Sequence, residues 1–416
     1  MRHAHRLRPL WARLALLASV IGPGIITANV DNDAGGITTY SIAGAHFGYS
    51  VLWILPLVGI ALVIVQEMSA RLGVVTGKGL ADLIRESFGV RITTLVLGVL
   101  AFANLANTVS EFAGVAASME IFGVSKFISV PIAAVLVWLL IVRGNYKVVE
   151  RVFLVASAIY LTYVAAGILE RPDWPMIGRA LATPQFHFEK GYITILITII
   201  GTTIAPWMQF YQQSAIADKG LKPSDYAYER IDVVIGSLFA IGVAVFITIS
   251  CAATLHASGA RIETAKDAAL ALRSLAGPYA SILFAVGLLN ASLFSAAILP
   301  LSTAYVFCEA FGWESGVSRR ISEAPAFFGI YTALIVIGAG IILLPVRSLI
   351  QMMIISQTLN GILLPLILVV MLILVNNRQL MGEKFVNGRV LNTASIAVIV
   401  FLTGLTIMLV VSSFTG

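Results

Sequence analysis

Charged residues are scarce in this sequence of 416 residues, at 12% of the total, whereas 59% of the residues are hydrophobic. A soluble domain contains roughly 25% charged residues and about half apolar ones. The shortage of charge therefore excludes an ordinary soluble protein, and the mean hydropathy of +0.94 agrees with this. The apolar residues also form runs of about 20, the length that crosses the hydrocarbon core of a bilayer. We predict an all-α integral membrane protein.

Cysteine and histidine are rare as well. The two cysteines, Cys251 and Cys308, stand alone in or at the ends of apolar segments, which excludes a disulfide framework and the usual zinc spacings. None of the five histidines belongs to an HExxH motif, and no glycine-rich phosphate loop is present. We therefore predict neither an enzyme nor a bound cofactor. The net charge of +6 forms no basic, aromatic-interleaved face, so we expect no nucleic-acid partner. The partner is the lipid bilayer, and no obligatory protein partner is predicted.

Eleven segments are apolar enough to be transmembrane helices. Their approximate limits are 13–44, 49–70, 93–122, 127–142, 151–169, 193–218, 233–256, 279–311, 327–345, 349–376 and 394–413. The linkers between them are too short for a separate soluble domain. We therefore predict one polytopic domain, 1–416, with a first five-helix repeat at 13–169, a second at 193–376 and an additional helix at 394–413.

The distribution of basic residues predicts the orientation. Most of the 27 lysines and arginines fall in the segments that are cytoplasmic if the N terminus is cytoplasmic, in agreement with the positive-inside rule. With eleven spans, the C terminus is then extracellular. We expect the protein in the cell membrane.

The first apolar segment is interrupted by the stretch ANVDNDAGG, residues 28–36. Asp31, Asn32 and Asp33 can bond to nearby backbone groups and so compete with helix formation. Gly22, Pro23 and Gly24 weaken the helix that precedes them. Non-helical backbone inside a membrane is tolerated only where protein or water surrounds it. We predict a half-helix, an extended stretch near 30–36 and a second half-helix; an ordinary loop between two short helices is the alternative.

The sixth apolar segment is interrupted in the same way, by GTTIAP at residues 201–206. Pro206 removes a backbone donor, and Thr202 can bond to the backbone. Interruptions in spans one and six are typical of two halves related by an inverted repeat, with a substrate site near the bilayer midplane between them. A simple proline kink is the alternative for the sixth span taken alone.

The residue types at the interruptions indicate the kind of ligand. Carboxylate, amide and carbonyl oxygens suit hard divalent cations, and the backbone carbonyls of Val30 and Ala205 and the hydroxyl of Thr202 could add neutral oxygens. We predict Asp33 as the direct ligand. Asp31 is left open as a ligand, an indirect contributor or part of the entry, because residues two apart in an extended chain point to opposite sides.

Several segments resemble the NRAMP divalent-metal transporters. GPG at 22–24, GAHFGY at 44–49 and SARLGVVTGK at 69–78 match family blocks, and ANVDNDAGG stands at the family's DPGN motif, which places its aspartate at Asp33 and its asparagine at Gly36. SEFAGVA is similar to the family's AEFLGAA and implies a functional acid at Glu111. ISQTLNGILLP is similar to SQxxLxxxLP and implies a metal-site glutamine at Gln357. The resemblance covers about residues 20–376 and implies a LeuT-like bundle of eleven or twelve helices.

Two departures from the family pattern bear on ion selectivity. The family's MPH motif in helix 6 is replaced by Ala205, Pro206 and Trp207, and the helix 1 asparagine by Gly36. Loss of the thioether removes a ligand that favours softer metals, and both changes predict a roomier cavity for an ion that keeps some of its water. The pattern resembles the NRAMP-related magnesium transporters, so we expect Mg²⁺, and also Mn²⁺, as substrate. Met208 is a weaker candidate for a sulfur ligand.

Other departures bear on proton coupling. Trp207 and Gln212 stand at the family's helix 6 histidines, and Thr108 stands where an aspartate is common. We therefore predict transport without protons, or with weak coupling. Glu111 is then either a cavity-facing remnant of a proton route or a buried acid bonded to a neighbouring helix. Trp207 is either a packing residue or a cavity wall, and Asn32 is a further cavity candidate. The alternatives are a proton-coupled Mn²⁺ or Fe²⁺ importer and, more distantly, a sodium-coupled solute carrier of LeuT-like fold.

Overall fold

The structure is a computed structural model, and it describes residues 27, 30–143, 157–345 and 348–415. All regular secondary structure in these residues is helical. The main helices are α3 Ala34–Phe47, α4 Ile54–Thr76, α5 Leu80–Ile121, α6 Lys126–Val142, α8 Leu161–Leu169, α9 Trp174–Ala182, α10 Lys190–Thr203, α11 Pro206–Asp218, α12 Tyr226–Cys251, α13 Ala265–Ala269, α14 Arg273–Ala276, α15 Ala280–Phe311, α16 Pro325–Leu343, α17 Leu349–Val375, α18 Arg378–Phe385 and α19 Arg389–Thr415.

Eight helical segments of the described residues are long and apolar enough to cross a membrane, and two shorter apolar helices accompany them. In chain order these ten correspond to the second through the eleventh predicted spans. The first predicted span is represented by α3, because residues 13–26 and 28–29 lie outside the described part of the chain. The prediction of an all-α, multi-helix fold is therefore confirmed, whereas the full count of eleven spans stays a prediction.

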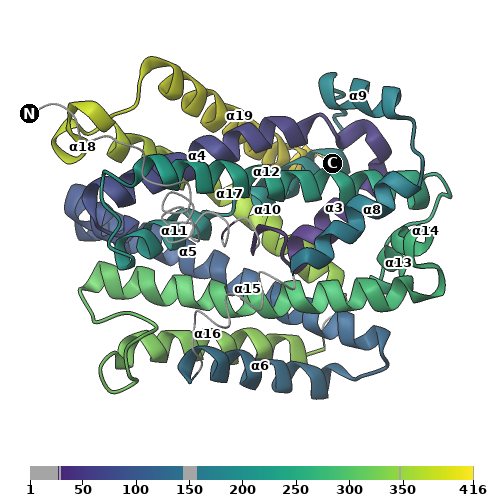
Figure 1. The fold of residues 1–416 in the computed structure, drawn as a ribbon, viewed down its shortest axis with the longest axis horizontal. Coiled ribbons are helices and arrows are strands. Elements are labelled where there is room, and N and C mark those ends of the chain that lie inside the picture. The colour runs from purple at the N-terminus through teal and green to yellow at the C-terminus, as the bar shows by residue number, and fades with distance from the viewer. Residues whose placement is uncertain (1–26, 28–29, 144–156, 346–347, 416) are drawn as a thin grey trace, which may run out of the picture.

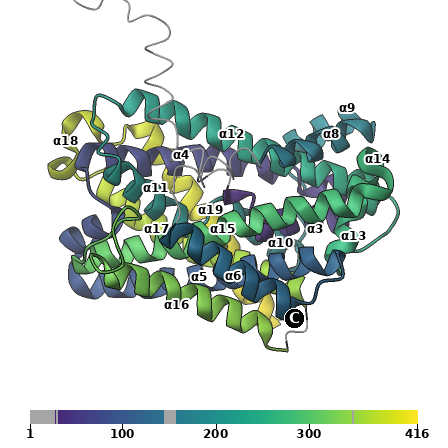
Figure 2. The ribbon, with the colours of Figure 1, turned by 60° about the horizontal axis from the view of Figure 1, so that its bottom comes forward.

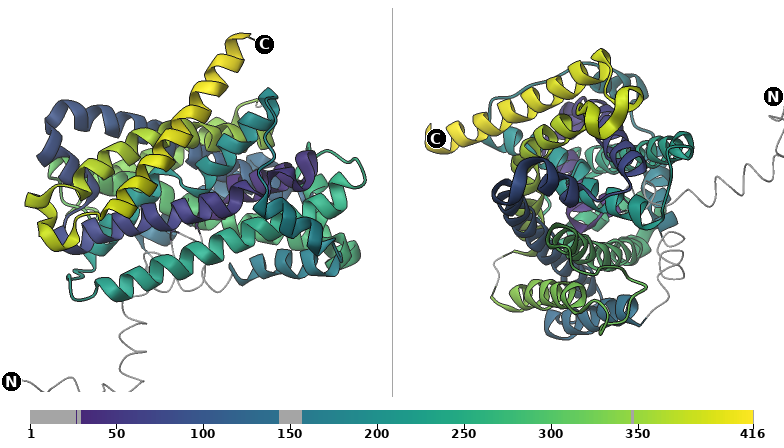
Figure 3. Two further views of the ribbon diagram at one scale, coloured as in Figure 1. Left: turned by 90° about the horizontal axis from the view of Figure 1, so that it is seen from above. Right: turned by 90° about the vertical axis from the view of Figure 1, so that its left-hand side faces the viewer.

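Helix α3 lies at the centre of the bundle. It contacts α5, α10, α12, α15 and α17, and Figure 1 shows it enclosed among them. Helices α6 and α16 lie side by side at one edge of the molecule, as Figures 1 and 2 show. Helix α19 lies at the opposite edge against α10 and α17, and Figure 3 shows it running across that face. Helix α18 lies at one end of the bundle, and α9, α13 and α14 lie at the other. The central helix is thus the one that carries the predicted site.

Close contact between α10 and α17 depends on glycine. A Cβ added to Gly201 would lie 2.1 Å from the carbonyl oxygen of Gln357, and one added to Gly361 would lie 2.4 Å from the carbonyl oxygen of Ile197. Both contacts are with backbone atoms, which cannot move aside as a side chain can. Small residues at such positions let helix backbones approach closely in membrane proteins. The close approach of α10 and α17 therefore helps to fix the position of Gln357, on α17, relative to α3.

Candidate metal-ion site

The first predicted interruption is present, but it is shorter than expected. Helical conformation stops at Asp31, and α3 begins at Ala34. Between them, Asp33 is extended, with φ −70° and ψ −175°, and its side-chain oxygen accepts a hydrogen bond from the Gly36 nitrogen at 2.6 Å. An aspartate in this position caps the helix by satisfying a free backbone donor. Because Asp33 starts the second helix, the non-helical stretch covers Asn32 and Asp33 instead of the whole of 30–36.

The second predicted interruption lies between α10 and α11. Helix α10 ends at Thr203, Ala205 is extended with φ −69° and ψ 140°, and α11 begins at Pro206. Proline fits the first position of a helix because its missing N–H has no partner there. The Tyr40 hydroxyl is 2.7 Å from the Thr203 hydroxyl, so α3 is tied to the end of α10. The two interruptions are therefore neighbours in space. Their placement at the bilayer midplane stays a prediction.

Three helices bring polar side chains together at the start of α3. The side-chain nitrogen of Gln357, from α17, lies 3.4 and 3.3 Å from the two carboxylate oxygens of Asp33. The Ala34 nitrogen donates to a carboxylate oxygen of Glu111, from α5, at 3.3 Å, and the Glu111 carboxyl also interacts with the Asp33 carboxyl. All three side chains are buried. Glu111 is thus a buried acid bonded to a neighbouring helix, the second of the two predicted possibilities, and it lies directly beside Asp33.

Thr202 and Gly36 face one another across the two interruptions. A Cβ on Gly36 would lie 3.2 Å from the Thr202 hydroxyl oxygen but only 2.6 Å from the Asp31 carbonyl oxygen. The Thr202 hydroxyl has no hydrogen-bond partner within the described ranges. The structure therefore places Thr202 where it was predicted, beside the interruption in α3. At Gly36, however, the Asp31 backbone already occupies the space that a side chain would use.

Val30, Asp31 and Asn32 are also buried, immediately before Asp33. Among the residues that the structure describes, neither the Asp31 carboxylate nor the Asn32 amide has a hydrogen-bond partner. Asp31 lies close enough to Asp33 and to Tyr40 for the charges of these groups to interact. The direct or indirect role of Asp31 stays open, as it does at the sequence level.

Ala205 and Trp207 lie at the start of α11, and both are buried. The Ala205 carbonyl accepts from the Met208 nitrogen at 3.1 Å and from the Gln209 amide, oriented with its nitrogen toward the backbone, at 2.8 Å. A carbonyl oxygen has two lone pairs, so both are occupied in this conformation. The Trp207 ring packs at a tilt against Tyr211, with centroids 6.1 Å apart, which is a packing contact.

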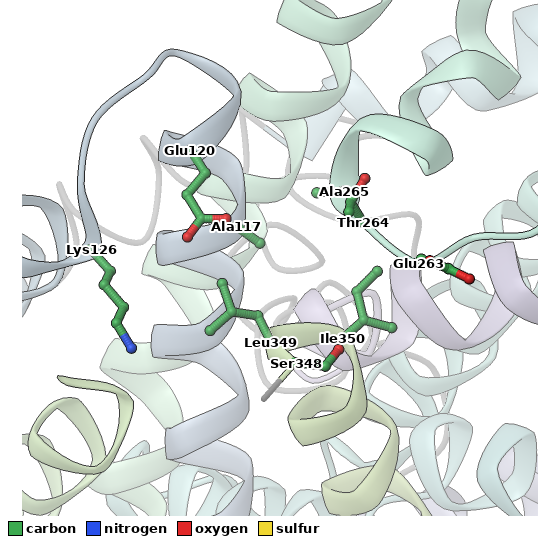
Figure 4. Close-up of a pocket in the computed structure, with 9 residues that line it drawn as sticks. All are labelled: Ala117, Glu120, Lys126, Glu263, Thr264, Ala265, Ser348, Leu349 and Ile350. Carbon is green, nitrogen blue, oxygen red and sulfur yellow. The ribbon is translucent and has the colours of Figure 1, made fainter. Parts of the chain in front are cut away.

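A cavity of about 320 Å³ lies between the C-terminal end of α5 and the N-terminal end of α17. This end of the bundle is opposite to the one that carries α18. Figure 4 shows Glu120 of α5 and Glu263 of the segment before α13 among the residues that line it. Lys126 also lines it, but its ammonium group donates to the carbonyls of Ile342 and Leu344, each at 2.8 Å. The cavity lies roughly two helical turns along α5 and α17 from Glu111 and Gln357. The cavity therefore lies on the same two helices as Glu111 and Gln357, closer to their ends.

A second polar cluster lies on α4, away from Asp33. Arg71 pairs with Glu67 one turn away, at 3.1 Å. Arg71 also donates to the Phe385 carbonyl at 3.0 Å and to the Asn387 side chain, and the Tyr226 hydroxyl donates to Glu67. The cluster joins α4, α12 and α18 and contributes no atom to the site.

Sulfur lies near the site, but on a different helix from the one that the family pattern indicates. The Met353 sulfur accepts a hydrogen bond from the Thr38 hydroxyl at 3.4 Å, and Met353 is one helical turn from Gln357. Within the described ranges, no group of three or more histidine, cysteine or acidic side chains is placed to hold a metal. An ion at Asp33 would therefore depend on amide, hydroxyl and backbone oxygens beyond the carboxylates.

Sequence reasoning missed three residues that complete the site. Tyr40, in the middle of α3, contacts Thr203 at the end of α10, and Asn360 donates to the Gln357 oxygen at 2.9 Å. Asn107 pairs with Asn360. Their polarity is the sequence signal that could have identified them, because a polar side chain inside a transmembrane span costs free energy and is typical of a functional site.

The family description "Natural resistance-associated macrophage protein-like" matches residues 24–412. The divalent metal cation transporter MntH of Yersinia pestis is 28% identical over 409 residues, covering 95% of each chain. MntH of Ralstonia nicotianae is 27% identical over 403 residues, covering 92% of this chain and 87% of the relative.

Solved structures show the same fold. The manganese transporter of Eremococcus coleocola superposes with a TM-score of 0.77 at 23% identity, covering 99% of this chain and 88% of that one. The nucleobase-cation-symport-1 transporter Mhp1 superposes with a TM-score of 0.61 at 16% identity, covering 94% and 89%. The second match confirms the predicted LeuT-like architecture. With the family description matching nearly the whole length, the chain belongs to the Nramp family.

Proposed function

We propose that the protein transports divalent metal ions, Mg²⁺ and also Mn²⁺, through a site centred on Asp33. The observation that carries this proposal is the meeting of Asp33, Glu111 and Gln357 at the start of α3, buried among five helices. Relatives named divalent metal cation transporter support the class of substrate. No catalytic activity and no resident cofactor form part of the proposal.

A cation is the ligand that the charges favour. Two carboxyl groups that lie next to one another repel when both are ionised, and Asp33 and Glu111 are in this position. Asp31 is a third acid near Asp33, and the charge of Asp33 acts on it. A divalent cation between these groups relieves the repulsion, and Thr202 and Gln357 add neutral oxygens of the kind that Mg²⁺ and Mn²⁺ accept.

The preference for Mg²⁺ is supported by the residue at position 205. The family motif has a thioether there, whereas this chain has a buried methyl group. A site without that sulfur no longer favours softer metals. In the present conformation the Asp31 backbone fills the space next to Gly36, so room for a partly hydrated ion at that position requires the Asn32–Asp33 stretch to shift.

Transport without protons is supported by the absence of titratable groups at three positions. Trp207, Gln212 and Thr108 stand where the family pattern has histidines and an aspartate. Membrane voltage alone contributes about 4.6 kcal/mol per 100 mV to the uptake of a divalent ion, twice the value for one charge. This is sufficient to accumulate Mg²⁺ without a coupled ion. Glu111 is an acid beside Asp33 that could still carry a proton.

We further propose that the N terminus is cytoplasmic and the C terminus extracellular, with residues 13–169 and 193–376 forming the two repeats and 394–413 the additional helix. On this orientation the cavity of Figure 4 opens to the outside. Labelling of tags at the two ends in intact cells, before and after permeabilisation, tests it: only the C-terminal tag should react before permeabilisation.

The central experiment measures Mg²⁺ uptake into proteoliposomes that contain an internal Mg²⁺ dye or an internal pH dye. Wild-type protein should take up Mg²⁺ without acidifying the lumen, and Asp33→Ala should take up none. Glu383→Gln, which alters an exposed carboxylate on α18, should behave as wild type. Normal Mg²⁺ uptake by Asp33→Ala would exclude the site, and robust acidification with the wild type would exclude uncoupled transport.

The same vesicles separate the alternatives. A proton-coupled Mn²⁺ or Fe²⁺ importer would take up Cd²⁺ strongly and Mg²⁺ poorly, and acidification would accompany uptake. A sodium-coupled solute carrier would show solute uptake driven by a sodium gradient and would be indifferent to Mg²⁺.

A further inference from the structure

Two buried asparagines face each other between α5 and α17, next to the site. The side-chain nitrogen of Asn107 donates to the oxygen of Asn360 at 3.0 Å, and the nitrogen of Asn360 donates to the oxygen of Asn107 at 2.9 Å. Both side chains are at most 1% exposed. A buried amide costs free energy unless it is hydrogen-bonded, and here each amide satisfies the other. In the pattern SQxxLxxxLP that this segment resembles, leucine stands at the position of Asn360.

The pair is also hydrogen-bonded to Gln357, the glutamine of the proposed ion site. The nitrogen of Asn360 donates to the side-chain oxygen of Gln357 at 2.9 Å, and the nitrogen of Gln357 faces the two oxygens of Asp33. The Gln357 oxygen is therefore held away from Asp33. This orientation suits a site without an ion, because an N–H group compensates the carboxylate. It does not suit a loaded site, where a cation requires the amide oxygen.

Loading the site therefore requires the Gln357 amide to turn over. Its nitrogen then faces Asn360, which must offer an oxygen in place of its nitrogen. If Asn360 turns over, the reciprocal pair is preserved only when Asn107 turns over as well. After all three amides have turned, every hydrogen bond among them is made again with donor and acceptor exchanged, and the ion replaces the Gln357 nitrogen beside Asp33. Amides allow this because each carries a donor and an acceptor on one planar group.

We propose that Asn360 and Asn107 are positioning residues for ion binding, which turn over together with Gln357 so that the ion-free and ion-loaded sites are both fully hydrogen-bonded. The inference rests on the proposed function, since it takes Asp33 and Gln357 as the place where the ion binds. It adds that the affinity of the site depends on a chain of three amides that leads from Asp33, at the start of α3, through α17 to α5.

The direction of the effect follows from the charge of the ion. A cation on the Gln357 oxygen polarises the amide and strengthens the bond from its nitrogen to Asn360, because hydrogen bonds that involve charged groups are stronger than neutral ones. Removing Asn360 therefore destabilises the ion-loaded site more than it destabilises the ion-free site, and this difference lowers the affinity for the ion. We expect Asn360→Leu to raise the Kd for Mg²⁺ and Mn²⁺ about tenfold. Asn107→Leu should act in the same direction but by about threefold, because Asn360 still contacts Gln357.

The chain offers a matched control on the same helix. Asn104 of α5 is buried, and its nitrogen donates to the Thr303 hydroxyl of α15 at 2.7 Å, with no bond to the Gln357 chain. Asn104→Leu removes an equally buried amide and an equally buried bond between helices. If the asparagines act only through packing, Asn104→Leu and Asn360→Leu should affect ion binding alike.

The test is a double-mutant cycle on the full-length protein in detergent, with Kd for Mg²⁺ and for Mn²⁺ measured by calorimetry and thermal unfolding recorded for each variant. In the Gln357→Ala background, Asn360→Leu should change Kd by less than about twofold, because the group through which it acts is gone. Equal effects of Asn360→Leu in both backgrounds, or an equal effect of Asn104→Leu, would overturn the inference.

Asp33→Ala distinguishes this failure from failure of the proposed function. If Asp33→Ala abolishes binding while the cycle is additive, the ion binds at Asp33 but the amide chain does not position Gln357. If Asp33→Ala binds both ions as tightly as wild type, the site itself is wrong, and the inference fails with it.

Discussion

Gln357 donates from its side-chain nitrogen toward both carboxylate oxygens of Asp33, at 3.4 and 3.3 Å, although the two residues are 324 positions apart. Asp33 simultaneously caps α3 by accepting from the Gly36 nitrogen. One carboxylate thus has a structural role and the proposed ligand role, and the two can be separated by substitution.

Asp33→Asn should separate charge from capping. Asparagine caps a helix about as well as aspartate, so thermal unfolding of the variant should match wild type. The charge that attracts a divalent ion is lost, and Mg²⁺ uptake should fall at least about tenfold. Uptake in proteoliposomes and a thermal unfolding curve on the same preparation measure both effects. If Asp33→Asn also unfolds at a clearly lower temperature than wild type, loss of the helix cap, and not loss of ion binding, would explain the fall in uptake.

Ala205→Met should restore a soft ligand. We expect Cd²⁺ to compete with Mg²⁺ uptake at a concentration lower by on the order of tenfold, because thioether sulfur favours softer metals. Ala205→Leu introduces a side chain of similar size without sulfur and is the control. If both variants gain Cd²⁺ sensitivity equally, the volume of the residue matters and its sulfur does not.

Gly201→Ala should push α10 and α17 apart. The added Cβ would meet the Gln357 carbonyl at 2.1 Å and the Gly361 nitrogen at 2.3 Å, and backbone atoms cannot yield without moving a helix. We expect a cost of about 1–3 kcal/mol in stability and reduced ion affinity, since Gln357 moves away from Asp33. Gly242, on α12, has open space at its Cβ position, so Gly242→Ala should be neutral. Calorimetric Kd and thermal unfolding measure both effects, and a neutral Gly201→Ala would show that the close approach is not needed.

Glu120→Gln combined with Glu263→Gln should weaken the attraction of cations to the cavity of Figure 4. Both groups are exposed, so their field acts at long range and is screened by salt. We expect KM for Mg²⁺ uptake to rise about two- to threefold at low ionic strength, with an unchanged maximal rate. The difference should disappear at high ionic strength. A difference that persists at high salt would indicate direct contact with the ion instead.

Arg71→Met should destabilise the protein without altering ion affinity. The pair with Glu67 is buried, and removal of one partner leaves an uncompensated charge, which costs about 3–5 kcal/mol. The double variant Glu67→Gln, Arg71→Met should recover part of the stability, because no buried charge is then unpaired. Thermal unfolding and Kd for Mn²⁺ measure the two properties. A raised Kd in folded Arg71→Met would show that this cluster communicates with the site.

The sequence by itself determined that the chain is a helical membrane protein and where its helices lie, because apolar runs of spanning length leave few other structures for the backbone. It also located both interruptions, since Asp31, Asn32, Asp33 and Pro206 carry side chains that compete with helix formation at those positions. Motif resemblance pointed to Glu111 and Gln357, which lie where an ion at Asp33 would meet them.

Only the tertiary structure decided how these parts act together. It shortened the first interruption, because Asp33 bonds forward to Gly36 and starts a helix. It filled the space at Gly36 with the Asp31 carbonyl, a contact that depends on backbone angles no residue pattern specifies. It also joined Asn107 to Asn360, 253 positions apart. A hydrogen bond between helices depends on their rotation and depth, and these are set by packing such as the glycine contact between α10 and α17.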